Sequence, residues 1–336
     1  MKIVTMKNFF LAVLALLVLG VIFQTTSTWI DQYRFQPPGQ QVYVNGKRWH
    51  YCCSGNGPQT VILDAGLGSG SLDWSLVQPK IAEFTRVFSY DRAGYGWSDE
   101  SSNSRTSDQI VEELHLLLNQ AEIPKPYILV GHSFGGINMQ LYFSKYPEEV
   151  QGIILVDSSH PEQVEKLPPE PEKSVVEHPS VQMLLSRLGV IRVLCSIPYV
   201  KNMIYETFLS FPVSIRKMYL AQYSSTKYIR TFTRENEAFE ENLRQVKERH
   251  ISFGSTPLVV IAAGAESKGE WLNSYPELLA WIQQSASIWH DLQKDLLSKS
   301  SQSEFLIAEE SDHMIPRNQP EIVVQAVQSI QQMCLK

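Results

Sequence analysis

The stretch LVGHSFGGI at residues 129–137 places Ser133 between two glycines, Gly131 and Gly135, each two positions away. The apolar run PYILV at residues 126–130 precedes the serine and predicts a buried strand. Gly-x-Ser-x-Gly between a strand and a helix is typical of a nucleophile elbow, a turn so sharp that these flanking positions must be small. The alternative is an ordinary glycine-rich turn. The strand before the pattern favours Ser133 as a nucleophile.

Other apolar runs predict a parallel sheet around this turn. A strand that is apolar throughout is typical of a parallel sheet covered on both faces, and amphipathic helical stretches alternate with the runs. Asn45-Gly46 is a strong hairpin signal between two alternating stretches at the start. We therefore expect an α/β fold with a mostly parallel central sheet and helices on both faces. The predicted strands are residues 59–66, 85–91, 126–130, 150–157, 256–264 and 303–309.

The alternation of strands and helices breaks at residue 160. From Pro161 to about His250 the sequence has a Pro- and Glu-rich entry and then helical stretches, with no clear strand. The strand pattern then resumes, which predicts a helical lid inserted between two strands of one core. The expected division is 1–30 as a membrane segment, 31–160 as the first part of the core, 161–250 as the lid and 251–336 as the second part of the core.

The N-terminal segment predicts an uncleaved signal anchor that forms a transmembrane helix. Lys2 and Lys7 precede a run without charge from Phe9 to Phe23, and no small-x-small cleavage site follows it. Trp29 and Tyr33 suit the membrane interface. Because the lysines lie only at the front, the N-terminus is expected inside and the rest of the protein on the extracytoplasmic side.

The composition argues against a nucleic-acid partner and against a metal site. The 336-residue chain has a formal net charge of −6, which provides no basic face for nucleic acid. Its four cysteines match no zinc-binding spacing, because the adjacent pair lacks the usual two-residue gap. We expect free thiols, and neither a metal nor an organic cofactor. The cysteines are Cys52, Cys53, Cys195 and Cys334.

A serine nucleophile needs a histidine base, and that histidine needs an acid to orient it. In this type of sheet the chain order is Ser, acid, His. His313 lies in a loop after the last predicted strand, whereas the other histidines beyond residue 160 lie in lid or helical segments. Asp157 ends a predicted strand and is the preferred acid, with Glu266, just after the next strand, as the rival.

Acyl transfer also needs hydrogen-bond donors for the oxyanion of the tetrahedral intermediate. The amide after the nucleophile, Phe134 N–H, is one candidate. The loop LDAGLGSGS at residues 63–71 can supply a second donor, and Leu67 is the expected position. Glycines in this loop allow the backbone to approach a ligand closely.

These motifs make residues 40–335 resemble the α/β-hydrolase fold family, in particular lidded hydrolases with an N-terminal anchor. YDRAGYGWSD at 90–99 resembles the family's Asp-x-x-Gly-x-Gly-x-Ser segment. The resemblance implies a Ser133 nucleophile, a His313 base and a Leu67/Phe134 oxyanion hole.

Three features depart from the family pattern. Ala65 stands where many relatives have His, and Asp312 stands where Gly is usual before the histidine, which Asp tolerates because it can adopt positive φ. The aspartate commonly expected after the seventh strand is missing.

Together these observations predict a serine hydrolase that cleaves a carboxylic ester or a related acyl compound without a cofactor. Serine at the elbow argues against dehalogenation and epoxide hydrolysis, which by resemblance use a carboxylate nucleophile in this fold. The alternatives are a carbon–carbon bond hydrolase or lyase with the same residues, and a binding protein without turnover. Apolar and aromatic residues of the lid either line an apolar substrate pocket or pack the lid helices; they include Met183, Leu184, Tyr199, Met203, Tyr205, Phe208, Phe211, Tyr219 and Tyr223.

Overall fold

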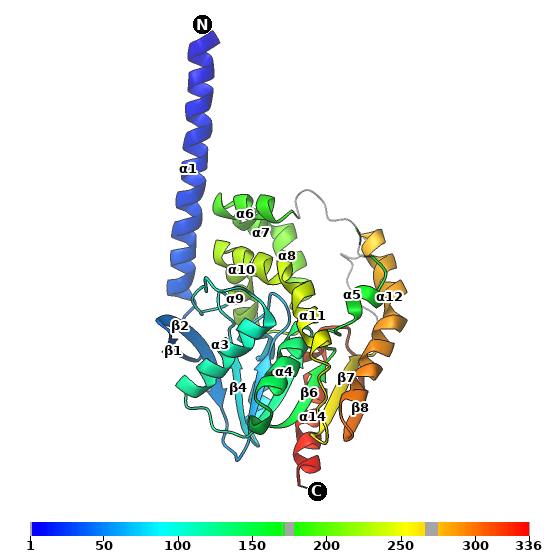
Figure 1. Ribbon diagram of the computed structural model, residues 1–336. Helices are drawn as coiled ribbons and strands as arrows, with labels where there is room; N and C mark the ends of the chain where they lie inside the picture. Colours follow the sequence, from blue (N-terminus) through cyan, green and yellow to red (C-terminus); the bar gives the residue numbers. More distant parts are fainter. Residues whose placement is uncertain (1, 170, 172–177, 266–274, 336) are drawn as a thin grey trace. The chain divides into compact units, whose positions relative to one another are not determined.

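The computed structural model describes residues 2–169, 171, 178–265 and 275–335, and its strands form one eight-stranded sheet (Figure 1). The strand order is β1-β2-β4-β3-β5-β6-β7-β8. β1 pairs antiparallel with β2 and β2 antiparallel with β4, while the remaining neighbours are parallel. The expected mostly parallel sheet is confirmed. The strands are β1 (Gln40–Val44), β2 (Lys47–Ser54), β3 (Thr60–Asp64), β4 (Arg86–Tyr90), β5 (Tyr127–His132), β6 (Val150–Val156), β7 (Leu258–Ala263) and β8 (Ser303–Ala308).

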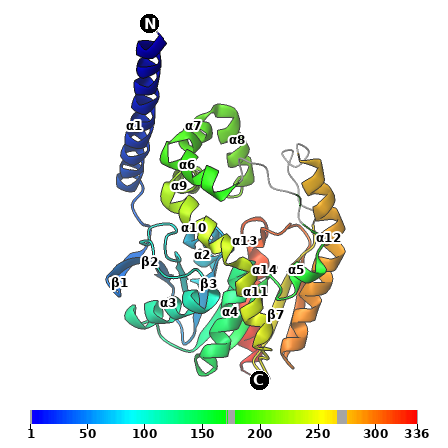
Figure 2. The same ribbon diagram turned by 45° about the horizontal axis from the view of Figure 1, so that its top comes forward.

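Both faces of the sheet are covered, since β3 and β5 are buried at every position. In β5, Leu129 packs into one hydrophobic cluster and Ile128 and Val130 into the other, as the two-residue period of a strand requires. Helices α3, α4 and α11 contribute to the first cluster, and α2 and α14 to the second (Figure 2). The bounds are α2 (Gln78–Ile81), α3 (Ser107–Gln120), α4 (Phe134–Lys145), α11 (Phe239–Glu248) and α14 (Pro320–Met333).

The remaining elements of the sheet unit are short, apart from one long helix that precedes β8. They are α5 (Gln163–Lys166), α12 (Pro276–Asp295), α13 (Ile315–Asn318) and the 3₁₀ helices Ser71–Trp74, Pro147–Glu149 and Leu296–Lys299. The predicted hairpin between β1 and β2 is confirmed, since Asn45 and Gly46 both have positive φ, 50° and 73°. Two positive φ angles in a two-residue loop match the right-handed twist of the flanking strands.

The chain divides into two compact units, Pro38–Pro171 with Arg234–Lys336, and Met1–Pro37 with Glu172–Thr233. The first is the sheet unit and the second is the helical unit. The sequence places the lid at 161–250, but the structure groups 161–171 and 234–250 with the sheet. Asn242 accounts for part of this grouping, because its Oδ1 accepts a hydrogen bond of 2.7 Å from Ser107 N–H at the start of α3.

The helical unit contains α1 (Lys2–Arg34) and the helices between β6 and β7. Phe208, Phe211 and Tyr219 are buried in this unit and stack on one another, with ring centroids 4.5 to 6.3 Å apart. These three aromatic residues therefore pack the lid helices together, which is one of the two roles predicted for the aromatic residues of the lid. The helices are α6 (Pro179–Arg187), α7 (Val190–Ser196), α8 (Pro198–Thr207), α9 (Val213–Tyr223) and α10 (Thr226–Glu237), and α10 continues into the sheet unit.

Helix α1 extends past the predicted segment 1–30 to Arg34. Its stretch Met6–Arg34 is long and apolar enough to cross a membrane, a test that a signal sequence near the N-terminus would also pass. All four cysteines are free and partly buried, as expected of free thiols.

Neighbouring leucines on α3 provide a direct test of the core. Leu117 is fully buried in the cluster under α3 and α4, whereas Leu116 is 43% exposed. Leu117→Ala should destabilise the protein by about 2 to 5 kcal/mol, because the cavity adds to the lost transfer free energy. Leu116→Ala should change stability by no more than about 0.5 kcal/mol. Thermal unfolding of the detergent-solubilised protein, followed by circular dichroism, measures both; similar midpoints would contradict this packing.

Candidate active site

Ser133 occupies a strained turn between β5 and α4. Its backbone has φ 52° and ψ −120°, a conformation that non-glycine residues rarely adopt. The end of β6 and the residues directly after it hold the turn through the backbone of Ser133. Its N–H donates to Val156 O at 3.1 Å, and its carbonyl accepts from Ser159 N–H at 3.0 Å. The end of β6 thus fixes the serine on the predicted sharp turn.

The two glycines of the motif are needed for close backbone packing. A Cβ on Gly131 would lie 2.5 Å from Gly135 O, and a Cβ on Gly135 would lie 2.3 Å from Asp64 O at the end of β3. Neither distance leaves room for a side chain. The small residues expected from the sequence are therefore required by contacts within the turn and with β3.

Asp157 and His313, expected as acid and base, lie side by side. His313 Nδ1 is 2.5 Å from Asp157 Oδ2. The second carboxylate oxygen, Oδ1, accepts from Ala263 N–H and from Trp289 Nε1–H, each at 3.0 Å. Asp157 is buried and has φ 41°. The carboxylate is thus oriented by β7 and α12, and Trp289 is a contributor that the sequence did not indicate.

The histidine before the serine connects His313 to the turn. His132 Nε2 is 2.8 Å from His313 O, and the two rings lie 4.9 Å apart. Burial, with a smaller effect of His313, lowers the pKa of His132 to about 3. His132 is therefore neutral and donates its Nε2–H to the carbonyl, which can only accept. This contact ties the backbone of His313 to the residue directly before Ser133.

Hydrogen bonding also defines the tautomer of His313. The buried Asp157 is ionised, because hydrogen bonds led by that from His313 hold its pKa below the ordinary value despite burial. A carboxylate can only accept, so His313 Nδ1 carries the hydrogen and Nε2 of the neutral ring keeps a free lone pair. Burial lowers the pKa of His313, but the hydrogen bond and charge of Asp157 raise it by more, so it lies above the ordinary value.

The sequence has two more acidic residues of interest here, Glu266 as the rival acid and Asp312 directly before the histidine. The rival acid Glu266 lies outside the described residues. Asp312 does not use the positive φ that an aspartate would tolerate at this position. Its side chain stabilises the bend instead: Oδ1 accepts from Met314 N–H at 3.0 Å and from Asn318 Nδ2 at 2.8 Å.

The loop expected to supply an oxyanion donor passes next to Ser133. A Cβ on Gly66 would lie 3.4 Å from Ser133 Cβ. Within the described part of the chain, neither Leu67 N–H nor Phe134 N–H donates a hydrogen bond to the protein. Both candidate donors are therefore available to a ligand.

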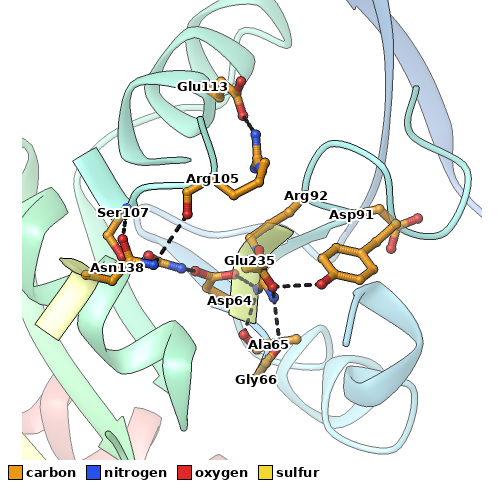
Figure 3. Close-up of polar contacts among 12 residues, drawn as sticks. Asp64, Ala65, Gly66, Asp91, Arg92, Arg105, Ser107, Glu113, Asn138 and Glu235 are labelled. Carbon is orange, nitrogen blue, oxygen red and sulfur yellow. Dashed lines mark hydrogen bonds and ion pairs between the residues drawn. The ribbon is translucent and has the colours of Figure 1, made fainter. Parts of the chain in front are cut away.

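Asp91 and Arg92, directly after β4, hold this loop at both ends. Arg92 Nη1 donates to Ala65 O and Nη2 to Gly66 O, each at 2.7 Å, while Asp91 Oδ1 accepts from Ser71 N–H at 2.8 Å. Arg92 lies beside the two carbonyls in Figure 3. The clamp formed by these two residues gives the Asp-x-x-Gly-x-Gly-x-Ser segment a physical role.

The clamp also explains the glycine and serine of that segment. A Cβ on Gly96 would lie 2.0 Å from Asp91 Oδ2, so the carboxylate occupies the space that a side chain would need. Ser98 Oγ donates to Asp91 O at 2.7 Å and accepts from His50 N–H at 2.9 Å. His50 Nδ1 lies 2.7 Å from Asp91 Oδ2. Asp91 is thereby fixed by β2 as well as by its own loop.

Two buried carboxylates enclose Arg92, one from the end of β3 and one from α10. Nη1 lies 2.8 Å from Asp64 Oδ1, and Nε lies 2.9 Å from Glu235 Oε1 at the end of α10 (Figure 3). Asn138 Nδ2 donates to the other oxygen of Asp64 at 2.8 Å. Neither Arg92 nor Glu235 has a sequence signal of its own, because the motif around Arg92 is recognised by its glycines. No group of three or more His, Cys, Asp or Glu side chains within the described residues is placed to bind a metal ion.

Comparisons with known proteins agree on the fold. Residues 60–184 match the profile of a family described as alpha/beta hydrolase fold. The uncharacterised protein YqjL of Bacillus subtilis is 26% identical over 276 residues, 82% of this chain and 85% of YqjL. An esterase structure from Thermogutta terrifontis superposes with a TM-score of 0.57 at 19% identity, covering 88% of this chain and 99% of the esterase.

One relative carries a specific enzyme name. The 2-hydroxy-6-oxononadienedioate/2-hydroxy-6-oxononatrienedioate hydrolase of Escherichia coli is 32% identical over 114 residues. That match covers 32% of this chain and 39% of the relative. It therefore relates one part of the core to that enzyme.

The Asp157–His313 pair predicts how His313 titrates. In a histidine NMR titration, His313 should titrate above the ordinary pKa of about 6.5. Asp157→Asn should lower the His313 pKa, since the hydrogen bond and charge of Asp157 then no longer oppose the effect of burial. His132, neutral above about pH 3, is the internal reference that should not change.

The raised pKa of His313 also makes stability depend on pH. Because the folded-state pKa is raised, the pair stabilises the fold fully below pH about 6.5, and the contribution is lost as the pH rises through the raised pKa. An unchanged His313 titration in Asp157→Asn would contradict the pairing.

Proposed function

Because the chain belongs to the α/β-hydrolase superfamily, we propose that it is a serine hydrolase that cleaves a carboxylic ester or related acyl compound. The observation that carries the proposal is the 2.5 Å hydrogen bond between Asp157 and His313 beside the strained turn of Ser133. A buried, ionised acid that orients a histidine next to a serine on a sharp turn is the arrangement that nucleophilic acyl transfer needs.

In the proposed mechanism Ser133 Oγ attacks the carbonyl carbon of the substrate. His313 Nε2 accepts the hydroxyl proton, and Asp157 stabilises the imidazolium that forms. Collapse of the tetrahedral intermediate releases the alcohol, which takes the proton from His313 and leaves an acyl-enzyme. Water then attacks this ester with His313 again as the base, so that the acid product leaves and Ser133 regains its proton.

Leu67 N–H and Phe134 N–H are the proposed donors to the oxyanion. Each is free of a protein acceptor within the described residues, and each lies next to Ser133 in the chain or in space. Donors aimed in advance at the developing charge lower the barrier because they need no reorganisation during the reaction. The clamp of Asp91 and Arg92 supports this role, since it fixes the backbone on both sides of Leu67.

The proposed setting is a membrane, with α1 as a single-pass anchor. The length and apolar character of Met6–Arg34 support the anchor, and Lys2 and Lys7 support an N-terminus inside with the catalytic part outside the cytoplasm. The proposed substrate is a small molecule with an apolar portion. No cofactor is required by the proposed steps.

A carbon–carbon bond hydrolase is the second candidate. The partial match to the Escherichia coli hydrolase favours it, and the same three side chains could act on a substrate whose scissile bond joins a carbonyl carbon to another carbon. A panel of p-nitrophenyl esters and vinylogous diketones separates the two: faster turnover of the diketones would replace the ester proposal.

Covalent labelling tests the nucleophile. A fluorophosphonate probe should label the wild-type protein at Ser133 and leave Ser133→Ala unlabelled, because only an activated serine attacks phosphorus rapidly. His313→Ala should also lose labelling, since no base remains. Ser159→Ala is a matched control, because Ser159 contacts Ser133 through its backbone N–H alone and should keep labelling. Equal labelling of wild type and Ser133→Ala would contradict the proposal.

Arg92→Lys tests the clamp on the oxyanion loop. Lysine keeps the charge, but its three donors cannot replace the five bonds that Arg92 makes to Glu235, Asp64 and the carbonyls of the loop, so the loop should lose its fixed geometry. We expect kcat for an ester to fall by about 10- to 100-fold with little change in KM, less than the roughly 10²- to 10³-fold that follows loss of a donor itself.

The control for this variant is Arg105→Lys. Arg105 forms another buried ion pair, with Glu113 at 2.8 Å, and among the residues that the structure describes it bonds none of the loop (Figure 3). It should retain kcat. If both variants lost kcat equally, and each loss matched the fraction of protein that no longer folds, Arg92 would act only through stability.

A further inference from the structure

The turn between α6 and α7 packs directly on the apolar part of α1. A Cβ on Gly20 of α1 would lie 2.6 Å from Leu188 O, and a Cβ on Gly189 would lie 2.8 Å from Phe23 Cδ1. Backbone therefore meets backbone at Gly20, and the ring of Phe23 packs on Gly189. In Figure 1, α6 and α7 accordingly lie beside the second half of α1. The contact falls within the uncharged run Phe9–Phe23.

Polar contacts between α1 and the lid helices begin where this run ends. Gln24, 4% exposed, donates from Nε2 to Ser224 O at 3.0 Å and accepts from Arg192 Nε at 3.1 Å. Arg192 also pairs with Asp31 and bonds Thr28 Oγ1 at 3.3 Å. At 1.5 Å per helical residue, Asp31 lies about 10 Å farther along α1 than Gln24. The guanidinium therefore extends away from the apolar run.

The segment after this turn is apolar and exposed. Residues 188–200 contain one charged residue, Arg192, and its charge is paired with Asp31. We call the exposed apolar side chains of this segment the α7 face. They are Val190, Val193, Leu194, Ile197 and Tyr199. Monomeric soluble proteins rarely expose so many large apolar residues together, and such a surface is typical of a protein or membrane contact.

We propose that the α7 face inserts into the interfacial layer of the bilayer that α1 spans. This inference rests on the proposed anchor. If Leu16, at the middle of the run, lies at the bilayer midplane, Gly20 lies about 6 Å and Phe23 about 10 Å from it. Both positions are within the roughly 15 Å half-thickness of the hydrocarbon layer. The turn that contacts them then lies at the same depth. The α7 face continues from that turn towards the interfacial layer.

The side-chain hydrogen bonds of Gln24 are consistent with this depth in the bilayer. Gln24 would lie about 12 Å from the midplane, where an unsatisfied amide is costly. Its Nε2 and Oε1 are both bonded to the lid helices. Tyr199 and Lys201 lie at the end of the α7 face, and an aromatic ring next to a lysine is typical of the membrane interface. A bilayer is therefore the partner that covers this face.

Depth measurements on the full-length protein test the proposal. All four native cysteines are replaced by serine, and single cysteines introduced by Val193→Cys, Leu17→Cys and Leu116→Cys carry the same environment-sensitive nitrobenzoxadiazole label. The three sites are similarly exposed, at 49%, 42% and 43%. Leu17 on α1 reports the anchor, and Leu116 on α3 of the sheet unit reports water. The protein is reconstituted into phosphatidylcholine vesicles with or without spin-labelled acyl chains.

We expect spin-labelled lipid to quench the labels at 17 and 193, with emission at shorter wavelength, and to leave the label at 116 unchanged. Ile197→Cys, about one helical turn further, repeats the measurement if the label at 193 disturbs folding. Quenching at 17 but not at 193 and 197 would leave the anchor intact and overturn the insertion of the α7 face. A blue shift at 193 without lipid quenching would assign the face to a second copy of the chain. Absence of quenching at 17 would overturn the anchor, and the inference with it.

Discussion

The left-handed backbone of Ser133 depends on the register of three parallel strands. A non-glycine residue in such a conformation costs about 1 to 3 kcal/mol, so surrounding contacts must hold it. β6 contributes the hydrogen bond from Ser133 N–H to Val156 O, and β3 contributes the close packing of Asp64 O on Gly135. Both contacts depend on pairing that aligns Asp64 with Gly131 and His132 with Val156. A shift of one residue in either strand would remove the support for the turn.

The same register brings the polar groups of the candidate site to one edge of the sheet. Asp64 ends β3, and Asp91, Ser133 and Asp157 each directly follow the neighbouring strands β4, β5 and β6. The carboxyl ends of parallel strands meet at one edge, where α/β sheets usually bind ligands. Each aspartate there is buried and bonded to a basic partner, so one sheet edge holds several ionised groups at fixed positions.

The features that periodicity and local turn chemistry determine could be predicted from the sequence. Apolar runs predict the strands, the spacing of small residues predicts the turn at Ser133, and the position of Asp157 at a strand end predicts its place beside His313. Chain order alone does not exclude Glu266, because it also follows a predicted strand whose end could reach the histidine. The direct contact between Asp157 and His313 supports Asp157 as the acid, while Glu266 lies outside the described residues.

Contacts between distant segments could not be predicted in this way. Arg92 and Glu235 are 143 residues apart, and no periodicity connects a glycine-rich turn with the end of a lid helix. Glu235 falls within the predicted lid 161–250, but its side-chain pairing with Arg92 ties it to the sheet unit. Asp312 illustrates the local limit: an aspartate can adopt positive φ, but the hydrogen bonds that its carboxylate accepts stabilise another conformation.

The buried network around Arg92 contributes orientation more than stability. Removing an arginine and two carboxylates from water has a large desolvation cost, and apolar residues of similar volume often fill such a space at least as favourably. Burial indeed raises the pKa of Asp64 above its ordinary value, even with Arg92 beside it. Apolar residues could not donate to Ala65 O and Gly66 O from fixed directions, as Arg92 does. The loop beside Ser133 requires such donors, because its glycines alone would leave the backbone free to rotate.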